Sequence, residues 1–429
     1  MTDTLTRSST EEITPRDVKI ASWICFFAWT SAVYDFVLFG NLLPELAADL
    51  GWSEPQSTQI NTWVTLGTAL VAFSIGPIAD RMGRRKGILI AVTGAAMASL
   101  LTATVGWVSG IAAGLGIVFL VLVRSLAGLG YAEQAINAAY LNEMYATQAD
   151  DPVRARRRGL IYSLVQSGWP VGSVLAAGSV YLLMPIGGWQ LCFVVAALPV
   201  VFILWAGRYL KESPQFSGQS QDETGSTSLV DVFRGESLRA TVFIGLPFML
   251  TWFGVLAFSI LGTSFLTSGK NISFDSALTV LVISNATAFV GYLFHGWLGD
   301  RIGRRNTIGL AWIACSVCFT AMLFAPDGNF PLIVALYSAG LFFLIGPFSA
   351  LLFFTGESFP VETRATGAAL VNAMGQVGAI FAGILVTGIL AAGQGWITAG
   401  MIAGCLPILL AGLLVFGARN VSPETVRAD

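Results

Sequence analysis

Three charged residues interrupt apolar stretches that are long enough to cross a bilayer. Asp35 lies in the first stretch, and Arg124 and Glu133 share the fourth. A charge at the bilayer centre costs about 2.5–3.5 kcal/mol even on insertion scales, so such residues usually have a function. A buried carboxylate near a cation can take up and release a proton near neutral pH. The chemistry that these residue types favour is therefore proton transfer.

Asp35 and Arg124 are predicted to lie at similar depths, because the first span runs outward and the fourth runs inward. They could meet across a central cavity as a proton-coupling pair, and protonation of Asp35 would then change the favoured conformation. A static ion pair that fixes helix packing is the other reading. Glu133 lies on roughly the opposite face of its helix from Arg124. We interpret Glu133 either as a second proton site or as a packing partner.

The composition indicates a membrane protein. Of 429 residues, 55% are hydrophobic and 11% are charged, and the mean hydropathy is +0.73. A soluble protein carries about 25% charged residues. Long apolar runs in lipid form helices, because the backbone must satisfy its own hydrogen bonds there. We predict an all-α membrane protein with twelve transmembrane helices in two six-helix bundles, at residues 19–44, 57–79, 87–107, 115–142, 160–184, 189–210, 240–267, 276–299, 306–325, 331–355, 367–391 and 395–417.

A polar segment at residues 211–239 is predicted to be a flexible linker between the bundles at 19–210 and 240–417. Residues 1–18 and 418–429 are predicted to be polar tails. The first of these tails is mixed in charge and lacks the short apolar core of a cleavable signal peptide.

The distribution of lysine and arginine predicts the orientation of the chain, since these residues accumulate on the cytoplasmic side. Of the 23 such residues, all but Arg124 and Lys270 are assigned to the side that holds the linker and both tails. We therefore predict a multi-pass protein of the plasma (inner) membrane with both termini in the cytoplasm.

A ten-residue pattern occurs twice. Residues 76–85 read Gly-Pro-Ile-Ala-Asp-Arg-Met-Gly-Arg-Arg, and residues 296–305 read Gly-Trp-Leu-Gly-Asp-Arg-Ile-Gly-Arg-Arg. Their aspartates, Asp80 and Asp300, are 220 residues apart (300 − 80). Each copy follows the second span of its half, so the two halves are predicted to share one orientation.

This repeated pattern resembles the signature of the major facilitator superfamily. The resemblance implies two six-helix bundles that rock around a central cavity, with the motif joining salt bridges that close the cytoplasmic side. The segment from Glu357 to Arg364 is similar to an element of sugar and organic-acid symporters in that superfamily. The cytoplasmic gate that the resemblance implies consists of Asp80, Arg84, Arg85, Glu143, Asp300, Arg304, Arg305, Glu357 and Arg364.

Polar and aromatic side chains at mid-depth are the candidate solute ligands. A single Trp or Tyr in a membrane helix more often faces lipid or a packing partner. Arg124 is the only mid-membrane cation in the sequence and could bind a carboxylate. The other candidates are Tyr34, Gln134, Asn137, Gln166, Trp169, Trp252, Asn285, Asn372 and Gln376.

Asp35 on the first span and Arg124 on the fourth resemble the metabolite, sialate and aromatic-acid proton symporters of the superfamily. This implies a secondary active transporter that works by alternating access and takes up a small organic acid anion (a monocarboxylate, aromatic acid or sialate) with protons. Two features depart from those branches: a second aspartate close to Asp35 is absent, and the fourth span reads Tyr131-Ala-Glu133 instead of Gly-Gly-Glu. A proton-coupled sugar or polyol symporter, an efflux carrier and a non-transporting nutrient sensor are the alternatives.

Other classes of protein fit poorly. His295 is the only histidine, which excludes most hydrolytic triads, and Cys315 and Cys318 have no second pair for zinc. We expect no enzyme activity, no cofactor, no metal and no nucleic-acid partner. The expected partners are a small-molecule substrate, protons and the lipid bilayer, with the monomer as the functional unit. His295 is predicted to be a polar residue at the membrane boundary, or alternatively a pH sensor.

Overall fold

Helices make up nearly all of the chain that the structure describes. The computed structural model describes residues 13–147, 164–212, 230–360 and 363–420, and no β-strand occurs within these ranges. The first helix, α1 (Pro15–Leu50), is capped by Thr14 and Asp17, each of which accepts a hydrogen bond from the backbone N–H of the other. This capping box starts the helix at Pro15 rather than at residue 19.

The helices of the N-terminal half follow the predicted spans, with breaks. The predicted fourth span is divided into α5 and α6 at Ala127, and the predicted turn at 185–188 contains the non-helical Gly187 and Gly188. The helices are α1 (Pro15–Leu50), α2 (Glu54–Met82), α3 (Arg84–Thr102), α4 (Val105–Ile111), α5 (Ala113–Leu126), α6 (Gly128–Ala146), α8 (Gly168–Ala197) and α9 (Pro199–Ala206).

The helices of the C-terminal half contain more irregular turns. The predicted seventh span is interrupted by π-helical turns at Thr241–Gly245, Leu256–Ile260 and Phe265–Gly269. Such turns inside membrane helices are frequent at functional sites. The helices are α11 (Gly235–Ala240), α12 (Leu246–Val255), α13 (Gly262–Ser264), α14 (Phe274–Ile302), α15 (Arg304–Phe324), α16 (Phe330–Ile345), α17 (Phe348–Ser358), α18 (Arg364–Ala391), α19 (Gly395–Gly400) and α20 (Leu406–Leu414).

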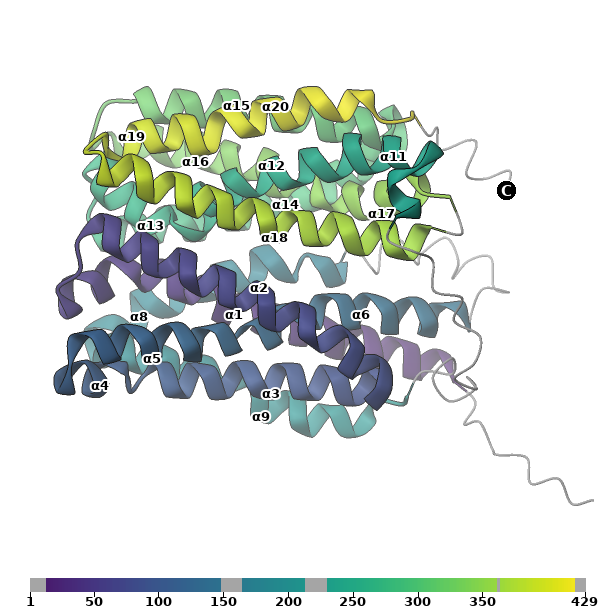
Figure 1. Ribbon diagram of the computed structural model, residues 1–429, viewed down its shortest axis with the longest axis horizontal. Coiled ribbons are helices and arrows are strands. Elements are labelled where there is room, and N and C mark those ends of the chain that lie inside the picture. The colour runs from purple at the N-terminus through teal and green to yellow at the C-terminus, as the bar shows by residue number, and fades with distance from the viewer. Residues whose placement is uncertain (1–12, 148–163, 213–229, 361–362, 421–429) are drawn as a thin grey trace, which may run out of the picture.

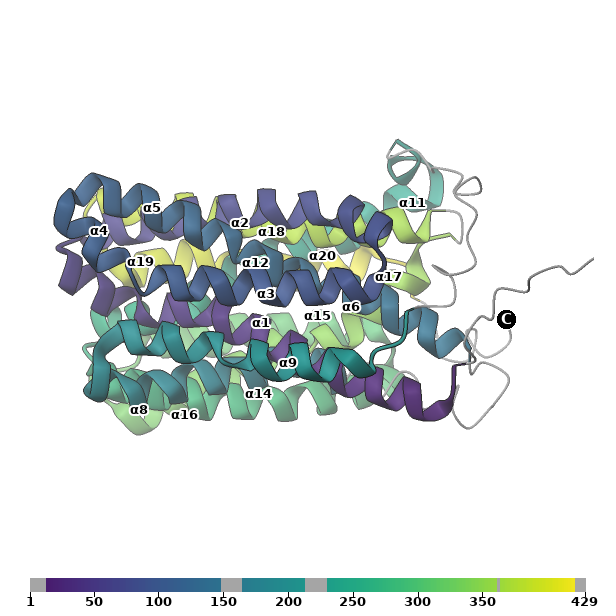
Figure 2. The same ribbon diagram turned by 90° about the horizontal axis from the view of Figure 1, so that it is seen from below.

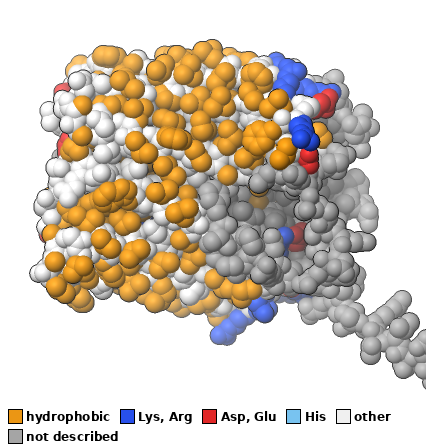
Figure 3. Space-filling model, in the orientation of Figure 1, with side chains coloured by type: hydrophobic (Ala, Val, Ile, Leu, Met, Phe, Trp, Pro, Cys, Tyr) orange, Lys and Arg blue, Asp and Glu red, His pale blue; other side chains and the backbone are white. Residues whose placement is uncertain are grey.

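The helices are long and apolar enough for a membrane. Ten candidate spans are found among the described residues, and one of them, Leu164–Tyr209, contains two predicted spans separated by the glycine turn. The more polar α2 adds a further helix of 29 residues. The fold is therefore the predicted one of twelve transmembrane helices. Hydrophobic side chains cover the flank of the molecule (Figure 3), as expected for a surface in contact with lipid.

The two halves lie side by side with their helices roughly parallel (Figures 1 and 2). Contacts between them involve α8 with α14, α2 with α18, and α1 with α13. We call the end of the molecule that carries Arg84, Arg85, Arg304 and Arg305 the basic end. The opposite end, which carries Glu54 and the start of α19, is called the far end.

Hydrogen bonds hold the halves together at the far end. The Trp396 indole donates to Glu54 at 3.0 Å, and the Thr387 hydroxyl donates to that of Thr58 at 3.1 Å. The Thr263 hydroxyl donates to the backbone carbonyl of Gly40 at 3.1 Å. A side chain at Gly40 would collide with the backbone carbonyl of Ile260, at the end of the π-helical turn that precedes Thr263. Glycine therefore permits this close approach. The far end is therefore closed.

Candidate functional site

Asp35 and Arg124 form an ion pair inside the N-terminal half. The distance from Arg124 Nη1 to Asp35 Oδ1 is 3.0 Å, and Arg124 Nη2 donates to the Asp35 carbonyl at 2.9 Å. The hydroxyl of Ser99, on α3, donates to the Asp35 carboxylate. Asp35 is 4% exposed and Arg124 is 1% exposed. Adding a proton to Asp35 would remove the counter-ion of a buried guanidinium, so the protonation of Asp35 and the local structure are linked.

The position of this pair corrects one prediction. The two residues do not face each other across the gap between the bundles, because α1 and α5 both belong to the N-terminal half. The rings of Phe39 and Phe193 lie 5.4 and 5.5 Å from the guanidinium carbon. For Arg124 to bind a solute as predicted, the solute would have to displace Asp35.

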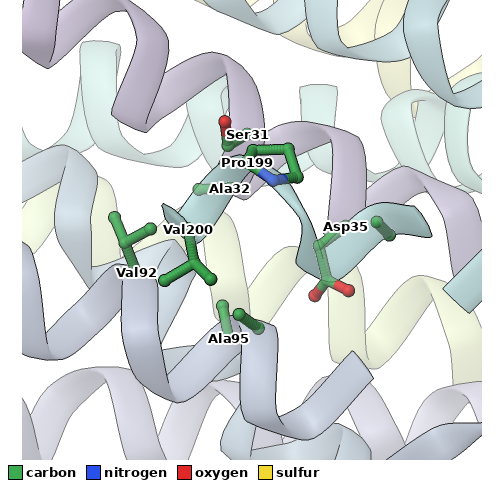
Figure 4. A pocket seen from close by; sticks show the side chains of 9 residues that line it. Ser31, Ala32, Asp35, Val92, Ala95, Pro199 and Val200 are labelled. Atoms are coloured by element: carbon green, nitrogen blue, oxygen red, sulfur yellow. The ribbon is translucent and has the colours of Figure 1, made fainter. Parts of the chain in front are cut away.

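A small pocket of about 10 Å³ reaches Asp35 from the side of α1, α3 and α9 (Figure 4). Small side chains on α3 and the helix break before α9 leave this space open. The Asp35 carboxyl group is thus not fully enclosed by packed side chains. The residues that line the pocket are Ser31, Ala32, Asp35, Val92, Ala95, Ala96, Ala196, Pro199 and Val200.

Glu133 is buried beside α1 and has no basic partner among the described residues. Its Oε1 accepts a hydrogen bond from Asn137 Nδ2 at 3.0 Å, and the same amide donates to the Cys25 carbonyl at 2.9 Å. The other carboxylate oxygen has no hydrogen-bond partner in the described part of the chain. These contacts describe a packed position inside the N-terminal half, and the proposed proton binding at Glu133 stays a prediction.

The predicted solute ligands fall into two groups. Tyr34 and Asn137 lie within the N-terminal half, where the Tyr34 hydroxyl donates to Ser179 at 2.9 Å. Trp169 and Trp252 instead meet across the two halves, with ring centres 5.9 Å apart and an interplanar angle of 87°.

The amide candidates differ in burial. Gln166, Asn285 and Gln376 are buried, and Asn372 is half-buried. Asn285 donates to the Leu281 carbonyl on its own helix at 2.9 Å, which leaves its carbonyl oxygen without a partner among the described residues. The side chain of Gln134 lies outside the described residues.

The repeated motif builds the same contact twice at the basic end. Arg84 Nε lies 3.2 Å from Glu143 Oε1, and Arg304 is paired with Glu357 in the same way. Burial raises the pKa of Glu357, although the neighbouring Arg304 partly offsets this effect. We call these two ion pairs the latches.

The second arginine of each motif binds the end of the last helix in its half. Arg85 Nε donates to the Gly207 carbonyl at 3.1 Å, and Arg305 Nη1 donates to the Ala418 carbonyl at 3.3 Å. The resemblance implied that both arginines of each motif pair with the glutamate of their half. Arg85 and Arg305 instead bind these backbone carbonyls.

The remaining gate candidates are more exposed or lie outside the described side chains. Asp300 is 67% exposed in its side chain and lies 3.7 Å from Arg304, and Arg364 is exposed. The side chain of Asp80 lies outside the described residues. Gly83 and Gly303 have φ of 97° and 87°, so the turn that presents each latch arginine needs glycine.

Two further polar residues are buried in the C-terminal half. His295, on α14, is buried against α16, with Nδ1 2.7 Å from the Gly291 carbonyl. Its ring lies against Gly346, where a side chain would collide with it. Lys270 is buried at the far end, bonded to Asp327 at 2.7 Å and to the Leu323 carbonyl at 3.2 Å.

Sequence reasoning missed the bond from Trp396 to Glu54 and the hydroxyl of Ser99. None of these residues belongs to a recognisable motif, and only the tertiary fold brings each of them next to its partner. The predicted depth of Ser99 in the third span was the one signal that could have placed it near Asp35.

A sequence profile of the Major Facilitator Superfamily matches residues 21–292 and again residues 248–428, which together include both halves. The chain belongs to the Major Facilitator Superfamily. It is therefore a multi-pass membrane transporter and not an enzyme.

Relatives in this superfamily carry small solutes. The chain is 26% identical to a probable 4-methylmuconolactone transporter of Cupriavidus pinatubonensis, over 81% of this chain and 78% of the relative. It is also 26% identical to a putative niacin/nicotinamide transporter of Bacillus subtilis, over 92% of this chain and 95% of the relative. Among solved structures, the xylose transporter of E. coli in an inward-open conformation has the same fold, with a TM-score of 0.70 and 17% identity over 96% of this chain and 99% of that one.

Proposed function

We propose that this transporter takes up a small organic acid together with protons across the plasma membrane. It works as a monomer, with its basic end and both termini in the cytoplasm. The excess of lysine and arginine at the basic end supports this orientation. The solutes for which the two relatives are named, a muconolactone and niacin or nicotinamide, support a small metabolite of this kind.

The observation that carries the proposal is the buried pair of Asp35 and Arg124. Two charges with side chains almost completely removed from solvent are costly in a membrane helix, and they are retained where they do chemistry. Ser99 and the pocket beside α3 supply a hydrogen-bond donor and a space next to the carboxylate.

The proposed cycle links this pair to the two ends of the molecule. With the far end closed, solute leaves through the basic end, and the deprotonated Asp35 holds Arg124. When the molecule faces outward, Asp35 takes a proton and releases Arg124. Protonation leaves the buried guanidinium of Arg124 without its counter-ion, which is unfavourable, and release of the proton after the return to the inward-facing state restores the ion pair.

Transport by purified protein in liposomes tests this proposal. The probes are labelled 4-hydroxybenzoate, N-acetylneuraminate and xylose, with an inward proton gradient of one pH unit. Protein-free liposomes report passive entry of the undissociated acid. For one proton per solute without a membrane potential, we expect about tenfold accumulation of one of the two acids. Accumulation of xylose alone would instead support the sugar symporter.

The variant Asp35→Asn should exchange labelled for unlabelled solute but accumulate none. Asp275→Asn, which changes an exposed aspartate at the start of α14, is the matched control and should accumulate like the wild type. Asp35→Glu keeps a carboxyl group and should retain partial accumulation. If the ion pair is static, Asp35→Asn will lower the melting temperature and still concentrate solute.

A further inference from the structure

Aromatic rings form a continuous row between the two halves at the middle of their helices. In the N-terminal half, the ring centres of Trp29 on α1 and Trp169 on α8 are 6.2 Å apart. Trp169 meets Trp252 of α12 at 5.9 Å, and this contact crosses from one half to the other. The ring centres of Trp252 and Phe248 are 6.3 Å apart, and those of Phe248 and Phe348 of α17 are 5.7 Å apart. The row thus contains aromatic rings from both the N-terminal and the C-terminal half.

Hydrogen-bond donors without partners lie in this region. Trp169 Nε1 and Gln376 Nε2 have no hydrogen-bond partner among the described residues. Trp169 is 7% exposed and Gln376 is 2% exposed. A buried N–H group without an acceptor is unfavourable and rare, so each such group needs an explanation. Gln376 follows Gly375 on α18, and a side chain on Gly375 would lie 2.5 Å from the Trp252 indole nitrogen, so this turn of α18 packs against the row.

Cations do not accompany these donors. In the described ranges, lysines and arginines lie at the two ends of the molecule, apart from Arg124. Arg124 is directed into the N-terminal half by Asp35, Phe39 and Phe193. A solute at the aromatic row therefore meets flat rings and neutral N–H donors.

We propose that Trp169 and Trp252 bind a planar aromatic ring between the halves, and that Trp169 Nε1 and Gln376 Nε2 bind an oxygen acceptor on that ring. Aromatic rings favour offset or edge-to-face contacts with other rings, which the row offers from both halves. Because the donors are neutral, a carboxamide satisfies them as well as a carboxylate does. The solute is thus selected by its flat shape and its acceptor, and not by its charge. This inference rests on the proposed function, whose substrate class it narrows.

Titration calorimetry on the purified protein in detergent tests the inference without a gradient. The three probes are 4-hydroxybenzoate, 4-hydroxybenzamide and 4-hydroxycyclohexanecarboxylate. We expect the benzoate and the benzamide to bind within about tenfold of each other, and the saturated ring to bind at least about tenfold more weakly. A benzamide that binds more than a hundredfold more weakly than the benzoate, a saturated ring that binds equally well, or no saturable binding by any probe would overturn the inference.

Variants locate the site. Trp252→Ala should weaken both aromatic probes at least about tenfold, and Trp252→Phe, which keeps a ring, should weaken them less than about threefold. Gln376→Leu should weaken the benzoate and the benzamide by the same factor. Trp107→Ala removes a tryptophan that is 81% exposed and should leave binding unchanged. Unchanged binding in Trp252→Ala with an unaltered melting temperature would contradict the inference.

The two proposals fail in different ways. Binding of both aromatic probes without proton-driven accumulation in liposomes would remove the coupling and leave the aromatic site. Proton-driven accumulation of the saturated acid as effectively as that of the aromatic acid would remove the aromatic site and leave the coupling.

Discussion

The two halves share their latches but differ in what they bury. Each half has an arginine from the repeated motif paired with a glutamate, Arg84 with Glu143 and Arg304 with Glu357. The interiors differ: the offset of 220 residues between the motifs (300 − 80) places the apolar Val255 where the first half has Asp35. The latch is therefore a device of both halves, whereas the proposed proton chemistry belongs to one.

Among the described residues, each half fully buries one cation, and the surroundings of the two cations differ. Arg124 is paired with a buried acid at the middle of the helices. Lys270 lies at the far end, where it binds backbone carbonyls after α15 and the half-exposed Asp327. Cations favour the C-terminal end of a helix, so Lys270 has a sufficient structural reason to be there. Arg124 lies in the last turn of α5, but its guanidinium group binds Asp35 on α1 and not the carbonyls at the end of its own helix.

Removal of the two buried cations should separate these roles. Arg124→Leu leaves Asp35 buried and unpaired, which should lower the free energy of unfolding by about 3–5 kcal/mol and abolish accumulation. Lys270→Met should lower it by about 1.5–3 kcal/mol through lost charged hydrogen bonds and leave the accumulation ratio unchanged. Thermal unfolding and liposome uptake measure both effects. A loss of accumulation in Lys270→Met at intact stability would contradict the comparison.

Alanine at the two motif glycines should test the equivalence of the latches. Gly83 and Gly303 have φ of 97° and 87° with ψ of 151° and 143°, a region that other residues reach only with strain. Gly83→Ala and Gly303→Ala should each cost about 1–3 kcal/mol, measured by unfolding. Effects that differ widely between the two halves would show that the turns are not equivalent.

The smallest effect concerns the latch of the C-terminal half. Glu357→Gln should raise stability by about 1 kcal/mol or less near neutral pH, because burial makes the ionised carboxylate less favourable in the folded state than a neutral amide. Burial raises the pKa of Glu357, so this carboxylate gains a proton at higher pH than an ordinary glutamate as the solution is acidified. The wild type should therefore gain stability relative to Glu357→Gln as the pH falls through that pKa, and the two melting temperatures should converge below it. A difference that stays constant down to pH 4 would argue against this raised pKa.

The sequence predicted much of the fold, because long apolar runs in lipid can form little besides helices. The resemblance implied that the motif arginines approach Glu143 and Glu357, which Arg84 and Arg304 do, whereas Arg85 and Arg305 bind backbone carbonyls. The depth of Asp35 and Arg124 was predicted well enough to bring them together. The side of α1 on which they meet was not predicted, because a nearly apolar helix has no polar pattern that fixes its rotation about its own axis.

The aromatic row was predicted only in part. Trp169 and Trp252 were selected by depth, whereas Trp29, Phe248 and Phe348 were not. With 29 phenylalanines and 12 tryptophans in the chain, type and depth cannot separate a ring between the halves from one that faces lipid. That distinction depends on tertiary packing.

The most direct test of the central claim, that Asp35 couples solute to protons, is proton entry that accompanies the solute. A pH-sensitive dye inside proteoliposomes follows this flux when 4-hydroxybenzoate is added outside, with protein-free liposomes as the baseline. The wild type should acidify the interior faster than the baseline, and Asp35→Asn should match the baseline while still exchanging labelled solute. Solute-dependent acidification by Asp35→Asn at the wild-type rate would contradict the account.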